Sequence, residues 1–172
     1  ELTPKEKKDV YYVQSKTSYA VKQSTKHFFV KDNVHDYTQK KPFLWTRGYQ
    51  VGGRSLMWGR WAYRRGDFEF ESNVKDWVGL DWPIRYKDIK KWYDYVENFI
   101  GVSGNKDNLP QIPDGNFLPP WSMNCIEKHI KSKIANHYND RVLTIGRTTN
   151  LTKSHGGRGK CLERNLCVRG CP

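Results

Sequence analysis

The stretch Trp82–Gly101, WPIRYKDIKKWYDYVENFIG, carries the clearest secondary-structure signal in the chain. Apolar residues recur in it at steps of three and four, which places them on one face of a helix. These residues are Ile89, Trp92, Tyr93, Val96, Phe99 and Ile100. Polar and charged residues fill the opposite face, and Gly101 supplies the end of the helix. We therefore expect an amphipathic helix whose aromatic stripe packs into the protein core.

A loop, a second helix and a short strand are expected after this helix. Gly, Pro, Asn and Asp are frequent over residues 104–120, where Pro113-Asp114-Gly115 is typical of a turn. A helix then begins near Met123, and Ser122 can cap its first turn. Its apolar edge consists of Ile126, Ile130 and Ile134, followed by His137 or Tyr138. The segment 141–147, RVLTIGR, has the composition of a strand.

Residues 1–41 are mostly polar and are interrupted by short β-type clusters. These clusters are VYYV at 10–13 and HFFV at 27–30, and KDN at 31–33 has the chemistry of a turn. We expect loops with short strands in this part of the chain.

The composition indicates a folded chain. A length of 172 residues suits one domain. Hydrophobic residues make up only 37%, but 14% of residues are aromatic and seven are Trp, which is too much large apolar surface for a disordered chain. Uncharged apolar runs stay far below the roughly 20 residues that span a bilayer, so a soluble chain without a membrane span is expected. The missing initiator Met and the ending within a Cys/Gly/Arg cluster indicate a fragment of a longer protein.

The formal net charge of +12 first suggests a nucleic-acid binder. The basic residues, however, are scattered, and no zinc-finger, basic-zipper or RNA-recognition signature accompanies them. Lys90 and Lys91 alternate with Asp88 and Asp94 on the expected helix, as on a solvated face. A solvated surface or an acidic partner chain is therefore expected, and nucleic acid is not.

The segment Pro42–Arg65, PFLWTRGYQVGGRSLMWGRWAYRR, alternates Gly, Arg and Trp with no lasting helix or strand period. Within it, Gly52-Gly53-Arg54-Ser55 places two residues without side chains beside a hydroxyl, so the backbone can approach a phosphate or a flat ring closely. The bulky residues Leu56-Met57-Trp58 that follow suit an extended aromatic ligand. An ordinary tight loop with a buried Trp explains the same residues, and composition alone favours that interpretation.

Four motifs, in the same order along residues 42–172, resemble the glucose-methanol-choline (GMC) family of FAD-dependent oxidoreductases. The resemblance is strongest to the bacterial branch near pyranose oxidase and the sugar dehydrogenases. The motifs are GYQVGGRSLMWGRWAYR (48–64), DWPIRYKDIKKWYDYVENFIGVSG (81–104), PDGNFLPPW (113–121) and RNLCVRGCP (164–172).

The resemblance implies an α/β fold. The chain is expected to be a mixed α and β, loop-rich fragment of a doubly wound FAD-binding domain joined to a substrate domain with an antiparallel sheet. In this division, residues 1–41 form a loop-rich segment with short strands, residues 42–75 line the flavin, and residues 76–172 belong to the substrate domain with its Cys-containing tail.

The resemblance also implies where FAD lies, because the family's Gly-Gly-x-Ser/Thr segment passes along the flavin. The positions carried over as FAD neighbours are Val51, Gly52, Gly53, Ser55, Met57, Trp58 and Gly59. Pyranose oxidases have a flavin-attaching His immediately before the Trp of this motif, where this chain has Met57. A thioether cannot form the histidyl-flavin bond, so the resemblance implies noncovalent FAD.

The implied reaction is oxidation of a CH–OH group of a sugar or polyol, in which a His base takes the hydroxyl proton and the carbon gives hydride to flavin N5. The family's fingerprint G-x-G-x-x-G does not occur in the chain, and none of the five histidines can be assigned as the base. The chain alone is therefore expected to be inactive. Its expected partners are the substrate and an electron-acceptor subunit or another partner chain.

Cys161, Cys167 and Cys171 follow the pattern Cys-x5-Cys-x3-Cys-Pro, while Cys125 stands alone on the second expected helix. Three nearby thiols fit a disulfide with a free thiol, an inert structural role, or the ligands of an iron–sulfur cluster. Structural zinc needs a fourth ligand that this segment does not offer. The spacing resembles that of bacterial flavin-dependent glucose dehydrogenases of the same family, whose catalytic subunit carries a three-iron cluster. Those enzymes have a further Cys where this chain has Leu162.

A function of another class is open at this point. A noncatalytic module could use the Trp-rich loop and the basic surface to bind carbohydrate or nucleic acid without flavin. Flavin absorbance separates the two functions, because only the oxidoreductase binds FAD.

Overall fold

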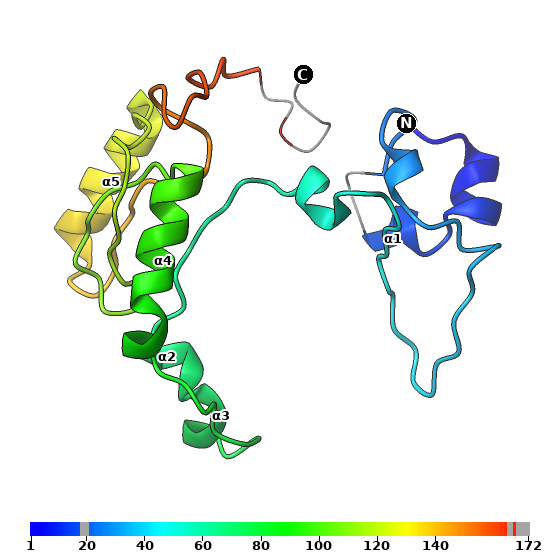
Figure 1. Cartoon of the computed structure of the whole chain (residues 1–172), viewed down its shortest axis with the longest axis horizontal. Helices are drawn as coiled ribbons and strands as arrows, with labels where there is room; N and C mark the ends of the chain where they lie inside the picture. Colours follow the sequence, from blue (N-terminus) through cyan, green and yellow to red (C-terminus); the bar gives the residue numbers. More distant parts are fainter. Residues whose placement is uncertain (18–20, 165–166, 168–172) are drawn as a thin grey trace. The chain divides into compact units, whose positions relative to one another are not determined.

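The computed structural model of the chain describes residues 1–17, 21–164 and 167. The chain forms two compact units, coloured along the sequence in Figure 1. Unit 1 comprises residues 1–59 together with 164–172, and unit 2 comprises residues 60–163. The boundary after Gly59 lies inside the segment 42–75 that the resemblance assigns to the flavin, so each unit contains part of this segment.

Short helical turns joined by loops make up unit 1. The turns are η1 (Glu6–Val10), α1 (Gln14–Thr17), η2 (Lys26–Phe28) and η3 (Gly53–Met57). The strands expected at 10–13 and 27–30 do not form, and part of the backbone there bonds locally. Tyr11 N–H donates to Glu6 O at 2.8 Å, and Phe29 N–H donates to Lys26 O at 3.0 Å. Donors used within a turn are not available to a neighbouring strand.

A small apolar core and a buried polar network hold unit 1 together. The core residues are Leu2, Tyr11, Val21 and Phe29. In the network, the Asp32 carboxylate accepts the backbone N–H of Val13 at 2.8 Å and the side-chain amide of Gln14 at 2.7 Å. Gln14 Oε1 in turn accepts Arg47 N–H at 2.9 Å. This network fixes the start of α1 to two loops that follow it, because Asp32 and Gln14 bond to both.

Four helices, α2 (Asp67–Phe70), α3 (Ser72–Lys75), α4 (Tyr86–Ile100) and α5 (Cys125–His137), belong to unit 2. The expected helix around residue 90 is confirmed as α4. Arg85 N–H donates to the Asp88 carboxylate at 2.8 Å at its start, and Gly101 ends it with a φ of 75°. That left-handed conformation favours glycine, so the sequence signal for the end of the helix is correct.

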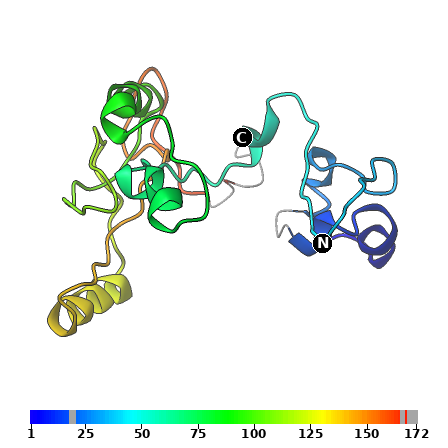
Figure 2. The same ribbon diagram turned by 90° about the horizontal axis from the view of Figure 1, so that it is seen from below.

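The second expected helix is confirmed as α5, but its cap is not Ser122. Asn124 is the N-cap: its side chain accepts Glu127 N–H at 2.9 Å, and Glu127 returns a bond to Asn124 N–H at 2.7 Å. This reciprocal capping box uses two backbone donors, which a lone Ser two residues earlier cannot do. Figure 2 shows α5, in yellow, set apart from α4, in green, and none of its residues is buried.

The aromatic stripe of α4 was expected to pack into the core, and this expectation is wrong for much of the stripe. Trp92 is 59% exposed and Phe99 is 70% exposed, whereas the buried residue of the helix is Glu97. The helix therefore turns a charged residue inward, toward the buried side chain of Arg64.

The buried side chain of Arg64 makes several hydrogen bonds within unit 2. Its Nε donates to Glu97 Oε1 at 2.7 Å, its Nη2 bonds Glu97 Oε2 and reaches Asp94 at 2.5 Å, and its Nη1 donates to Tyr86 Oη at 2.8 Å. Burial opposes the charge on Arg64, but the bonds to Glu97, Asp94 and Tyr86 raise the pKa of its guanidinium. Lys90 and then Arg64 hold the pKa of Asp94 below its usual range. These contacts therefore favour the charged forms of Arg64 and Asp94.

Isolated β-bridges, not strands, connect the rest of the described residues. Thr148 pairs with both Ser103 and Trp61, so the strand expected at 141–147 reduces to one bridging residue just beyond it. The loop 104–120 is confirmed, but its turn lies between Leu109 and Ile112 and not at 113–115. Arg147 holds the segment 113–115 in place, because its Nη1 donates to Pro113 O at 2.6 Å.

Within the described residues, no helix has both the length and the apolar character that a membrane crossing requires.

Candidate functional site

The two glycines of the candidate flavin segment adopt left-handed backbone conformations. Gly52 has a φ of 91° and Gly53 a φ of 65°; Gly52 is the N-cap of the short helix η3 and Gly53 is its first residue. Gly53 N–H donates to Gln50 O at 3.1 Å, and the Gln50 amide donates to Gly53 O at 2.8 Å. The Ser55 hydroxyl donates to Gly52 O at 2.6 Å. These bonds hold the turn in a defined shape, and the positive φ values explain why glycine is present.

One face of this turn is open. Val51 is 97% exposed, and Gly52, Gly53 and Ser55 are also exposed. A Cβ built on Gly53 would meet nothing within 4 Å, while one on Gly52 would contact Leu56 at 3.2 Å. Protein packing therefore does not account for the missing side chain at Gly53, and a planar group can lie against this backbone without a steric conflict.

The later residues of the segment anchor it to unit 1. Met57 is half-buried and packs against the core cluster that contains Leu2 and Tyr11. Trp58 N–H donates to Ser55 O at 3.4 Å, and both Trp58 and Gly59 are half-buried. The predicted FAD neighbours thus divide into an exposed part, Val51 to Ser55, and an anchored part, Met57 to Gly59. The exposed backbone leaves room for a flat ring, while the Gly53 N–H and the Ser55 hydroxyl are already bonded within the turn.

A second glycine pair, Gly156-Gly157, has the same kind of backbone but another role. It occupies the centre of a hairpin in which His155 and Arg158 exchange both backbone hydrogen bonds, at 2.9 and 3.0 Å. The Arg158 guanidinium donates to Phe99 O at 2.7 Å and to Ile100 O at 3.0 Å. The hairpin therefore caps the last carbonyls of α4, where a cation also suits the helix dipole.

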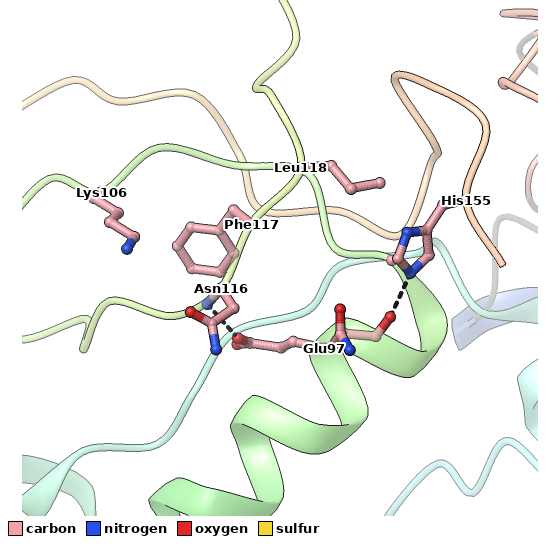
Figure 3. A pocket seen from close by; sticks show the side chains of 8 residues that line it. Glu97, Lys106, Asn116, Phe117, Leu118 and His155 are labelled. Carbon is pink, nitrogen blue, oxygen red and sulfur yellow. Dashed lines mark hydrogen bonds between the residues drawn. The ribbon is translucent and has the colours of Figure 1, made fainter.

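The pocket in Figure 3 contains a histidine and a carboxylate, which makes it an obvious place to look for acid–base chemistry. Its volume is about 200 Å³, and it lies between the end of α4 and the loop around Asn116. His155 Nε2 bonds to Asn98 O as part of the cap, and Glu97 is paired with Arg64 and accepts Asn116 N–H at 3.1 Å. Both side chains are engaged in holding the fold, so we do not assign them a catalytic role.

The cysteines are described in part. Cys161 Sγ accepts Glu163 N–H at 3.4 Å and is 3.9 Å from the Asn150 amide nitrogen. Cys161 and Cys167 are half-buried and belong to different units, and Cys125 is exposed on α5. Cys171 lies outside the described residues. Among the residues that are described, no three His, Cys, Asp or Glu side chains converge as a metal site.

Sequence reasoning missed several contacts that shape these sites. Asn150 approaches Cys161 from eleven positions away, and Arg64 reaches Glu97 across 33 positions. Neither pair has a local sequence signal, because both depend on how loops return to a helix. The cap from Arg158 had a usable signal, since Gly-Gly between two polar residues is typical of a tight hairpin.

Comparison with known proteins gives one informative similarity. The chain is 26% identical over 138 residues to the fructose dehydrogenase large subunit of Gluconobacter japonicus, a match that covers 71% of this chain. The chain spans 23% of the length of that relative. A search of protein-family models found no match. The chain is therefore distantly similar to part of a dehydrogenase subunit.

Proposed function

We propose that this chain is part of a GMC-type, FAD-dependent oxidoreductase that acts on a CH–OH group of a sugar or polyol. The observation that carries the proposal is the 138-residue match to a fructose dehydrogenase subunit. The collinear motifs of the chain and the open glycine turn support the same function. The relative is named as a large subunit, and the net charge of +12 suits an acidic partner, so an electron-acceptor subunit or another partner chain belongs to the proposal.

The residues Val51 to Ser55 would hold the flavin ring against exposed backbone. Gly53 keeps the space above the turn free, and Ser55 fixes the peptide of Gly52 through its 2.6 Å hydrogen bond. Met57 anchors the segment in the core of unit 1, so the turn keeps its shape before the cofactor arrives. When bound, FAD would accept a hydride from the CH–OH carbon. A fixed cradle lowers the entropy cost of binding.

The test compares two glycines that have the same local freedom. Gly53 and Gly157 both have positive φ, and a Cβ on either would meet nothing within 4 Å. Gly53→Ala and Gly157→Ala should therefore each cost about 1–2 kcal/mol of stability, the cost of placing alanine in a left-handed conformation. Only Gly53→Ala should also weaken FAD binding, because its methyl group would occupy the place of the ring.

FAD affinity is measured by fluorescence quenching with the protein and with each variant, and stability by urea unfolding. Acid precipitation should release all flavin into the soluble fraction, since Met57 cannot form a histidyl-flavin bond. Equal FAD affinity in the two alanine variants, or flavin retained on the precipitated chain, would contradict the proposed site. A protein that binds no flavin would favour the noncatalytic binding module.

We also propose that Cys161, Cys167 and Cys171 are ligands of an iron–sulfur cluster. What supports this is the spacing of the three cysteines and the N–H donors from Glu163 and Asn150 at Cys161 Sγ, since such hydrogen bonds stabilise ligating sulfur. Protein prepared without oxygen should contain iron, and Cys167→Ser should abolish it. Cys125→Ser is the matched control, because Cys125 is exposed on α5, and it should keep its iron. An iron-free protein would refute the cluster.

A further inference from the structure

Unit 1 contains a pocket of about 320 Å³ that the proposed function does not use. It lies between the residues before and within α1 and the loop 37–44. Its apolar wall consists of Val13, Tyr37, Pro42, Phe43 and Leu44, and Trp45 follows directly in the chain. Phe43 is 49% exposed and Leu44 is 53% exposed, so much of this wall is accessible.

The pocket wall is held in shape before any ligand arrives. The Tyr37 hydroxyl donates to Phe43 O at 2.6 Å, and Phe43 N–H donates to Gln39 Oε1 at 2.9 Å. The rings of Tyr37 and Phe43 lie 5.0 Å apart. Behind them, the Arg47 guanidinium lies over Tyr37 at 5.0 Å and over Trp45 at 5.1 Å. A rigid aromatic wall binds a flat group at a low entropy cost.

The polar groups of the pocket are mainly hydrogen-bond donors. Lys16 supplies an ammonium that makes no ion pair or side-chain hydrogen bond with another described residue. Gln39 uses its carbonyl oxygen on Phe43, which leaves its NH₂ for a ligand, and Tyr12 adds a hydroxyl. The lining residues include no Asp or Glu. Such a set of groups matches a ligand that accepts hydrogen bonds and carries negative charge.

We propose that this pocket binds a small compound made of one ring and one carboxylate. The volume lies near the lower limit of small-molecule sites, about 300–1,000 Å³, and suits a single ring. The ring lies against Phe43 and Tyr37, and the carboxylate bonds to Lys16. Sugar acids and aromatic acids both consist of a ring that carries a carboxylate. The site is independent of the flavin turn, so it stands or falls separately from the proposed oxidoreductase.

The experiment is a calorimetric titration of the protein with D-glucuronate and with benzoate, alongside the neutral compounds glucose and benzyl alcohol. At least one carboxylate should bind saturably, and about tenfold or more tightly than its neutral counterpart, because a hydrogen bond to a charged group contributes about 1.5–3 kcal/mol. A preference for glucuronate identifies a sugar acid as the ligand class, and a preference for benzoate identifies an aromatic acid.

Two variants test the assigned residues. Lys16→Gln should weaken carboxylate binding about tenfold or more, and Phe43→Ala should weaken it about two- to tenfold through lost ring contact. Lys91→Gln and Phe99→Ala, which change an exposed lysine and an exposed ring on α4, should leave it unchanged. Binding of neither carboxylate, equal binding of the neutral compounds, or unchanged binding by Lys16→Gln would overturn the proposal.

Discussion

Two glycine pairs in this chain share a backbone conformation and differ in what surrounds them. Gly52-Gly53 and Gly156-Gly157 all have φ between 55° and 91°. At the second pair, the neighbouring His155 and Arg158 bond to the end of α4, so the chain itself uses the turn. At the first pair, the neighbouring Val51 is almost fully exposed. On the other side of this pair, Arg54 donates to Thr46 O at 2.7 Å. The comparison teaches that a positive φ alone does not indicate a ligand, and that the exposed backbone around Val51 is what distinguishes the first pair.

The largest loss of stability is expected at Gly115, where a side chain would clash with its neighbours. A Cβ on Gly115 would overlap the Glu97 carboxylate and come within 2.5 Å of Arg64 Nη2. Gly115→Ala should cost about 3–5 kcal/mol, since it disrupts a buried ion pair. Urea unfolding of this variant beside Gly157→Ala measures the difference. Similar losses in the two variants would show that unit 2 does not depend on the Arg64–Glu97 contact.

Removal of the hairpin's cap should have an intermediate effect. Arg158→Ala removes two hydrogen bonds to the last carbonyls of α4 and one cation near the helix end, worth about 1–2 kcal/mol together. The backbone amides near the end of α4 should then exchange with solvent faster. Lys153→Ala changes an exposed lysine in the same tail and serves as the control. Unchanged exchange in Arg158→Ala would remove the structural task that distinguishes this hairpin.

Acid should loosen the unit that carries the first glycine pair. Lys26, followed by the backbone and hydroxyl of Thr3, lowers the pKa of Glu6 from 4.5 to about 2. Because the folded-state pKa lies below the unfolded one, this contact stabilises unit 1 fully above pH 4.5 and is lost as the pH falls toward 2. Since Glu6 is a single surface residue, we expect a smaller effect than at Arg158.

Glu6→Gln separates this contribution from the other acid-sensitive groups. Limited proteolysis near residues 50–55, followed from pH 5 to pH 2, should depend less on pH in the variant than in the parent. Unit 2 should keep its own acid response, because Lys90 and Arg64 lower the pKa of Asp94. An identical pH profile for the two proteins at residues 50–55 would show that Glu6 does not support the turn.

The sequence predicted the positions of the long helices α4 and α5 well, but not which face of α4 is buried. The end of α4 at Gly101 and the location of α5 followed from local signals, namely periodicity and a glycine in a left-handed conformation. The buried face of α4 did not, because periodicity identifies an apolar stripe but not what covers it. Glu97 is buried since Arg64 lies opposite, and that partner is 33 positions away.

The candidate flavin turn was predictable to a similar degree. Gly52-Gly53 and Ser55 were singled out by the resemblance to the GMC family, since composition alone favoured an ordinary tight loop, and the structure shows these residues exposed. The anchoring of Met57 in the core of unit 1 could not be predicted, because its neighbours Leu2 and Tyr11 lie far away in the chain. The short strands expected at 10–13 and 27–30 failed for a different reason: composition favoured extended backbone, but Tyr11 and Phe29 form local backbone hydrogen bonds.

The smallest change in stability is expected at Gly156, and comparison with Gly52 distinguishes the two glycine pairs. Gly156 has a φ of 55°, and a Cβ there would contact only the Arg158 guanidinium, at 3.4 Å. Asn tolerates this conformation and Asn-Gly is favoured in tight hairpins, so Gly156→Asn should change stability by no more than about 0.5 kcal/mol. Gly52 has a φ of 91°, and its Cβ would press on Leu56 at 3.2 Å, so Gly52→Asn should cost about 1–3 kcal/mol. Thermal unfolding of both variants measures the difference. Equal costs would mean that the first turn is as permissive as a simple hairpin, and its conformation would then no longer favour a role in binding.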